Sequence, residues 1–161
     1  MSPSEVAERL LNAGDAVAKI AREHADKLER PYAPGKWTGH QVVSHLADAD
    51  VVYLGRFFMA IAQPGGTIQP FNQDLWVKEL KEHQRPLEIS VALMQSTRAA
   101  FAHTLRSFSF DELQRRSVHP ERGELPALLM AQLMVQHAEH HLTQLEAVVA
   151  GRTWTKTGVW E

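Results

Sequence analysis

The sequence predicts an all-α protein, a four-helix bundle with a long connection between its second and third helices. Four long segments repeat apolar residues at steps of three or four, and no segment alternates apolar and polar residues as a strand does. Capping residues or helix breakers mark most of the segment ends. Residues 1–161 are expected to form a single domain, because this length is typical of one domain and no repeat divides the chain.

The first helix is predicted to begin after Ser2 and to end near Leu28. Ser2 and Glu5 fit a capping box, and Pro3 stands at the first helical position, where proline is well tolerated. Apolar residues then recur at helical spacing until two prolines, beginning at Pro31, interrupt the pattern.

The second helix is predicted to start at Thr38, where Thr38 and Gln41 form another capping box. It ends before the Pro-Gly-Gly breaker at residues 64–66. Its core-facing positions are Val42, Leu46, Ala49, Tyr53 and Phe57.

The rest of the chain supplies the connection and two more long helices. Residues 64–86 form the connection, which is long for a small domain and therefore a candidate for function. A short helix is expected within it over residues 74–81. The remaining expected features are a third helix over 87–107, a turn over 119–123, a last helix over 126–151 and a tail over 152–161 that carries two tryptophans.

The composition narrows the class of function. The chain has no cysteine, which excludes disulfides, thiolate ligands and a cysteine nucleophile. A net charge of -2 and the lack of a basic run do not favour nucleic-acid binding. The first residues do not resemble a signal peptide, and no apolar stretch is long enough to span a membrane. A cytoplasmic protein without membrane contact is therefore expected.

Three histidines are candidate metal ligands. His137 and His141 are four residues apart, so they lie one turn apart on the same face of the last helix. His45 lies on the core-facing side of the second helix and can supply the third ligand. Neutral imidazole suits Zn, Ni, Cu or Fe. With nine histidines in the chain, ordinary core or surface histidines are the alternative, and spacing alone leaves both open.

Two further polar residues share these faces. Asp48 follows His45 by three positions and can orient a ligand imidazole or hold a water, although a solvated helix carboxylate is an equal alternative. Gln144 follows His141 by three positions and can hydrogen-bond the same water. Asp48 and Gln144 are therefore the candidate catalytic residues.

Two motifs resemble signatures of the DinB-like superfamily. Residues 34–48 resemble its second-helix signature, and residues 137–144 resemble its last-helix signature. Weaker matches resemble the YfiT-like branch of metal-dependent hydrolases and bacillithiol S-transferases, namely Arg56-Phe57, residues 67–70, Trp76 and residues 119–121. Gln136 departs from the branch, which tends to have an aromatic residue before the first histidine of the last helix.

The resemblance implies a four-helix bundle that holds one divalent metal ion, commonly nickel or zinc. Carried over by position, the ligands are His45, His137 and His141. Related proteins use low-molecular-weight thiols such as bacillithiol or mycothiol, and many are dimers. A homodimer is also expected from Val43 and Phe58, which with Leu54 lie beside the inner stripe of the second helix.

The function that follows is metal-dependent transfer of a small thiol to an electrophilic small molecule. The sulfur must come from a substrate, because the chain has no cysteine. Arg56 and His119 are candidate substrate-binding residues, with a salt bridge and a turn contact as the respective alternatives. A metal-dependent hydrolase and a non-catalytic, stress-related metal-binding module remain open as other functions.

Overall fold

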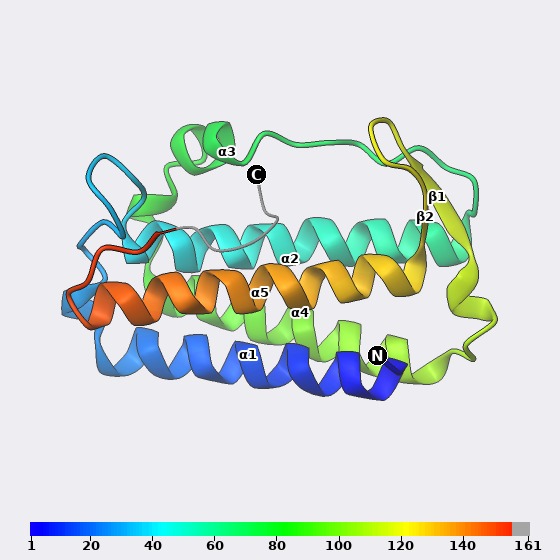
Figure 1. The fold of residues 1–161 in the computed structure, drawn as a ribbon, viewed down its shortest axis with the longest axis horizontal. Coiled ribbons are helices and arrows are strands. Elements are labelled where there is room, and N and C mark those ends of the chain that lie inside the picture. The colour runs from blue at the N-terminus through cyan, green and yellow to red at the C-terminus, as the bar shows by residue number, and fades with distance from the viewer. Residues whose placement is uncertain (156–161) are drawn as a thin grey trace.

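The computed structural model describes residues 1–155, in which four long helices pack side by side (Figure 1). They are α1 (Pro3–Glu23), α2 (Gly39–Ala62), α4 (Leu87–Ser107) and α5 (Ala127–Val149). Each long helix packs against two others, in the cyclic order α1, α4, α2, α5. The predicted all-α four-helix bundle is confirmed. No helix within residues 1–155 is both long and apolar enough to cross a membrane.

The helix starts follow the capping residues. In both capping boxes the side chain of the cap accepts a hydrogen bond from the third helical amide, and the Glu5 or Gln41 side chain accepts one from the cap amide. The end of α1 differs from the prediction. The helix stops at Glu23, and a short 3₁₀ turn over Ala25–Lys27 continues toward Leu28.

The connection between α2 and α4 runs along the outside of the bundle (Figure 1). It contains a short helix, α3 (Gln73–Glu79), and a 3₁₀ turn, η2 (Glu82–Gln84). Its first part lies beside a hairpin, because the Ile68 amide donates to the Val118 carbonyl at 2.8 Å. The first part of the connection is therefore held to the hairpin, and α3 and η2 contact α2.

The hairpin was not predicted from the sequence. Strands β1 (Arg116–His119) and β2 (Gly123–Pro126) pair antiparallel, with His119 opposite Gly123. The predicted turn over 119–123 is the turn of this hairpin, and Gly123 adopts a φ of 71°, which favours glycine. The predicted tail over 152–161 is described only as far as residue 155, and Trp160 lies outside the described residues.

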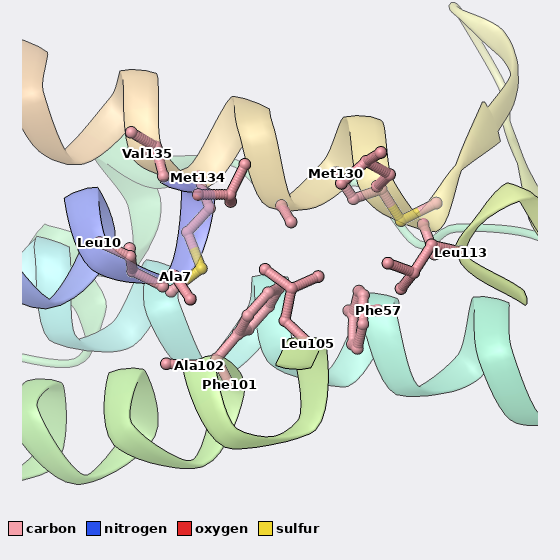
Figure 2. Close-up of a cluster of buried hydrophobic side chains, with 14 of the residues drawn as sticks. Ala7, Leu10, Phe57, Phe101, Ala102, Leu105, Leu113, Met130, Met134 and Val135 are labelled. Carbon is pink, nitrogen blue, oxygen red and sulfur yellow. The ribbon is translucent and has the colours of Figure 1, made fainter. Parts of the chain in front are cut away.

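The core is formed by the inner faces of the four long helices. Figure 2 shows one cluster, in which Phe57 from α2 meets Phe101 and Leu105 from α4 beneath Met130 and Met134 from α5. The structure corrects part of the argument for a dimer. Val43 has no exposed surface and belongs to the core, and Leu54 packs against the core, whereas Phe58 is 43% exposed.

Candidate metal centre

Helices α2 and α5 bring His45, His137 and His141 together. The Nε2 atom of His137 lies 3.1 Å from Nε2 of His45 and 3.0 Å from Nε2 of His141. One ligand nitrogen from each ring lies within 4.8 Å of those from the other two rings. All three side chains are buried, at 7% exposure or less. The three residues selected from the sequence thus form one cluster.

The spacing of the nitrogens fits a single ion. Zinc binds histidine nitrogen at about 2.0–2.1 Å, so the nitrogens around a tetrahedral ion lie about 3.3 Å apart. The observed contacts of 3.0 and 3.1 Å are close to that value. Three protein ligands leave at least one coordination position open, which is the pattern of catalytic rather than structural sites.

Gln144 holds one of the three rings. Its Oε1 atom lies 2.6 Å from Nδ1 of His141, and both side chains are buried. An amide oxygen only accepts hydrogen bonds, so Nδ1 carries the proton and Nε2 keeps its lone pair. Nε2 is the atom that faces His137. This is the usual way in which a neighbouring residue fixes the tautomer and orientation of a metal-binding histidine.

The environment keeps all three imidazoles neutral. Burial lowers the pKa of His45 to about 4, and the negative charge of Asp48 opposes this effect. Burial, together with the other histidines, lowers the pKa of His137 and His141 well below the usual value. Neutral imidazole is the form that binds a metal ion. The cluster is therefore ready for ligation at neutral pH without losing protons first.

Aromatic rings enclose the cluster on two sides. The Trp37 ring lies 4.9 Å from the ring of His45 and stacks on that of His141 at 6.5 Å. The Tyr53 ring lies 5.8 Å from that of His137. The sequence analysis assigned Tyr53 to the core-facing side of the second helix, because apolar periodicity cannot distinguish a core contact from a contact with a ligand.

A pocket of about 390 Å³ is lined by two of the three histidines, His137 and His141. Gln144 also lines it, and the loop before α2, the start of α3 and the segment after α5 contribute to its walls. A small molecule can therefore reach the open side of the cluster. The wall residues are Tyr32, Gly35, Lys36, Trp37, Gln73, Asp74, His140 and Trp154.

Asp48 faces a different set of partners. Its Oδ1 atom accepts a hydrogen bond from Nη1 of Arg85 at 2.7 Å. Arg85 also donates to the Ser44 carbonyl and the Ser90 hydroxyl. Asp48 is not among the residues that line the pocket. Its negative charge acts on His45, where it opposes the lowering of the pKa by burial. The Arg85 partner could not be read from the sequence, because 37 residues separate it from Asp48.

Arg56 and His119 lie apart from the pocket. Both line a smaller cavity beside Tyr53, between α2, the hairpin and α5. Arg56 donates to the Gln69 carbonyl at 2.6 Å, and Nδ1 of His119 accepts from the amides of Glu121 and Arg122. The structure brings these two predicted substrate-binding residues together, but not with Asp48 or Gln144.

Comparisons with known proteins identify relatives of this chain. A Bacillus cereus protein named "Putative metal-dependent hydrolase" is 28% identical over 128 residues, covering 80% of this chain and 73% of its own. A Bacillus anthracis protein of the same name is 27% identical over the same shares. A solved structure described as "YfiT from Bacillus subtilis is a probable metal-dependent hydrolase with an unusual four-helix bundle topology" matches with a TM-score of 0.86.

That structure is 22% identical and the match covers 95% of this chain and 89% of the other, which supports the same fold. The family model of the DinB superfamily matches residues 9–145, from the first helix to one residue after Gln144. The match includes His45, His137 and His141. The chain therefore belongs to the DinB superfamily.

Proposed function

We propose that this protein binds one divalent metal ion, nickel or zinc, through His45, His137 and His141. The observation that carries the proposal is the buried cluster of three neutral imidazoles, two of which line an accessible pocket. The names of the Bacillus relatives, which refer to a metal-dependent hydrolase, support a metal site of this kind.

The activity we propose is transfer of a low-molecular-weight thiol to an electrophilic small molecule. A bound divalent ion would lower the pKa of a thiol in the open position, producing a nucleophile near neutral pH. The chain has no cysteine to serve as the nucleophile. The resemblance to the branch that includes bacillithiol S-transferases, carried by Arg56-Phe57, residues 67–70, Trp76 and residues 119–121, supports the choice of a thiol.

Each polar residue has a proposed part in this reaction. Gln144 holds His141 in the orientation that the cluster needs, and it also lines the pocket that the thiol would enter. Asp48 acts through His45, because its negative charge opposes the loss of basicity that burial causes. Arg56 and His119 bind the part of the substrate that lies away from the reacting atoms.

Metal-dependent hydrolysis is the second candidate, because it needs the same site with water in the open position. The names of the relatives favour it. A non-catalytic, stress-related metal-binding module is the third. We further propose that the protein forms a homodimer through apolar residues that remain exposed on α2, on α3 and directly after α3, among them Val51, Leu75 and Leu80.

The test has two steps. Protein purified without a histidine tag is first analysed for metal content, and we expect about one divalent ion per chain. His141→Ala should lose stoichiometric binding, whereas His24→Ala should keep it because His24 lies outside the cluster. Equal metal content in both variants would reject the ligand assignment.

The loaded protein is then incubated with a model electrophile and with bacillithiol, mycothiol, glutathione or coenzyme A. Turnover that depends on one thiol and disappears in His45→Ala and His137→Ala would support the transferase. Ester or amide cleavage without thiol would favour the hydrolase. Full metal occupancy without either reaction would leave the binding module as the better proposal.

A further inference from the structure

A second, smaller cavity lies one helical turn from the histidine cluster. Leu133, which lines the cavity, precedes His137 by four residues, a distance of about 6 Å along the helix. The cavity measures about 110 Å³, roughly four times the volume that one water occupies in the liquid. It can hold a small polar group but not a whole substrate. The lining residues are Tyr53, Arg56, Ile68, His119, Arg122, Leu125, Met130 and Leu133.

The residues that line this cavity carry positive charge and include no carboxylate, although Glu121 acts on His119 and Asp50 acts on Tyr53 from outside the lining. Arg56, Arg122 and His119 are its basic residues, and none of its eight lining residues is an aspartate or glutamate. Among residues 1–155, no carboxylate forms an ion pair with Arg56 or Arg122. Two guanidinium groups that share a cavity repel each other, so an anion between them would be stabilising.

The Arg56 side chain is held in place and keeps one hydrogen-bond donor without a partner among the described residues. Its Nη2 atom donates to the Gln69 carbonyl at 2.6 Å, and its guanidinium carbon lies 5.9 Å from the Tyr53 ring centre and 5.5 Å from that of Phe71. These contacts fix the guanidinium between two aromatic rings. Its Nε atom is buried and has no hydrogen-bond partner within the described residues 1–155. A donor in that position is costly unless a ligand satisfies it.

The hairpin turn positions two more hydrogen-bond donors, the side chains of His119 and Arg122. Nδ1 of His119 accepts hydrogen bonds from the amides of Glu121 at 3.1 Å and Arg122 at 3.3 Å. In the neutral ring the proton is therefore on Nε2, which can donate. The same two contacts fix the backbone from which the Arg122 side chain reaches the cavity.

Tyr53 links the cavity to the metal centre. It lines the cavity, and its ring lies 5.8 Å from that of His137. Burial raises the pKa of Tyr53, and the positive charges of Arg56 and Arg122 oppose that effect. Burial and the same two arginines lower the pKa of His119, and the negative charge of Glu121 opposes that effect. Tyr53, His119, Arg56 and Arg122 therefore interact electrostatically with one another.

We propose that Arg56, Arg122 and His119 form a subsite that binds the carboxylate of the substrate. The substrate would then be a small carboxylic acid whose reacting group lies at the histidine cluster. The location of the reacting group rests on the proposed function, but the binding of a carboxylate does not.

Binding can be measured without metal or turnover. Sodium acetate is titrated into ¹⁵N-labelled protein at constant ionic strength, and the Nε–H signals of the arginines are followed by NMR. We expect a saturable shift of the Arg56 signal. Arg122→Gln should weaken acetate binding about tenfold or more, because a charge-assisted hydrogen bond is lost. Arg56→Lys, which keeps the charge but loses the fork, should weaken it as well.

The matched control is Arg116→Gln. Arg116 lies on the same hairpin, pairs with Glu124 at 3.0 Å and does not line the cavity. Acetate binding should be unchanged in this variant. A shift that does not saturate, or one that Arg116→Gln weakens as much as Arg122→Gln, would overturn the subsite. Binding of phosphate but not acetate would overturn the choice of a carboxylate.

A kinetic comparison separates this inference from the proposed function. If the enzyme turns over, Arg122→Gln should raise KM for an electrophile that carries a carboxylate but not for its methyl ester. An equal effect on both compounds would overturn the subsite while leaving the enzyme intact. Saturable acetate binding in a protein without any turnover would support the subsite and count against the proposed activity.

Discussion

Gln144 is the residue on which the orientation of the cluster depends most directly. Its Oε1 atom accepts a hydrogen bond from Nδ1 of His141 at 2.6 Å. We expect Gln144→Leu to weaken metal binding about 10- to 100-fold, because loss of such a partner frees the ring and its tautomer. Competition with a chromophoric chelator measures the affinity.

The control for this substitution is Gln136→Leu. Gln136 is on the same helix, next to a ligand, but its side chain is exposed. Metal affinity should be unchanged. If both variants bind the ion as tightly as the unmodified protein, the contact between Gln144 and His141 has no part in holding the metal.

The histidines of the cluster could be selected from the sequence because helical spacing places His137 and His141 on one face. His45 followed from its position on the core-facing side of α2. Arg122 and Arg85 could not be selected from the sequence as functional residues, because an isolated arginine in a polar segment is normally interpreted as a surface residue. Their partners come from other elements, and only folding brings them together.

At the scale of elements, a buried ion pair joins α2 to α4. Nε of Arg98 donates to Asp50 at 2.5 Å, and both side chains are at most 1% exposed. Asp50→Ala would leave the guanidinium buried without its counterion, which costs about 3–5 kcal/mol. We expect a loss of that order in the free energy of unfolding, measured by urea denaturation.

An exposed ion pair between two other helices provides the comparison for the buried pair of Asp50 and Arg98. Arg9 and Glu139 join α1 to α5 at 2.7 Å, but both side chains remain substantially exposed. Glu139→Ala should cost about 1 kcal/mol or less, because water screens an exposed pair. Similar losses in the two variants would mean that the burial of Asp50 and Arg98 does not govern the energy of their pairing.

Glu82 makes the contact between η2 and α2 sensitive to pH. It is 1% exposed, and burial, followed by the neighbouring Asp48 carboxylate, raises its pKa from 4.5 to about 8. Between these values the folded protein holds a proton that the unfolded chain has released, so stability falls as the pH rises. Glu82→Gln should therefore raise the urea midpoint at pH 9 and have little effect at pH 4.

Glu79→Gln is the matched control, because Glu79 is exposed at the end of α3. Its urea midpoint should follow that of the unmodified protein at both pH values. A Glu82→Gln variant with the same pH dependence as the unmodified protein would show that another group is responsible for the fall in stability.

The elements differ in how far the sequence determines them. The starts of α1 and α2 were predicted because a capping box is a local signal, contained in four residues. Strands β1 and β2 have four residues each, which is too short for alternation to be recognised. They also depend on contacts with residues 66–68 of the connection. Those residues are distant in the sequence, so a local sequence pattern does not reveal the contacts.

At the scale of the whole molecule, exposed apolar side chains bear on assembly. Leu75 and Leu80 are 53% and 57% exposed, and both line an apolar groove of about 670 Å³ between α2 and the connection. Val51, on the adjoining part of α2, is 46% exposed. Contiguous apolar surface of this kind is typical of an interface. We therefore expect a homodimer in sedimentation velocity at micromolar concentration.

Substitution within the groove tests which face forms the dimer. Leu75→Glu and Leu80→Glu should each shift the protein to monomer, because burying a carboxylate in an apolar interface is costly. Phe110→Glu is the control, since Phe110 is 60% exposed but lies between α4 and the hairpin, outside the groove. A monomer in the unmodified protein would reject the dimer. A dimer that only Phe110→Glu disrupts would place the interface at the other end of the bundle.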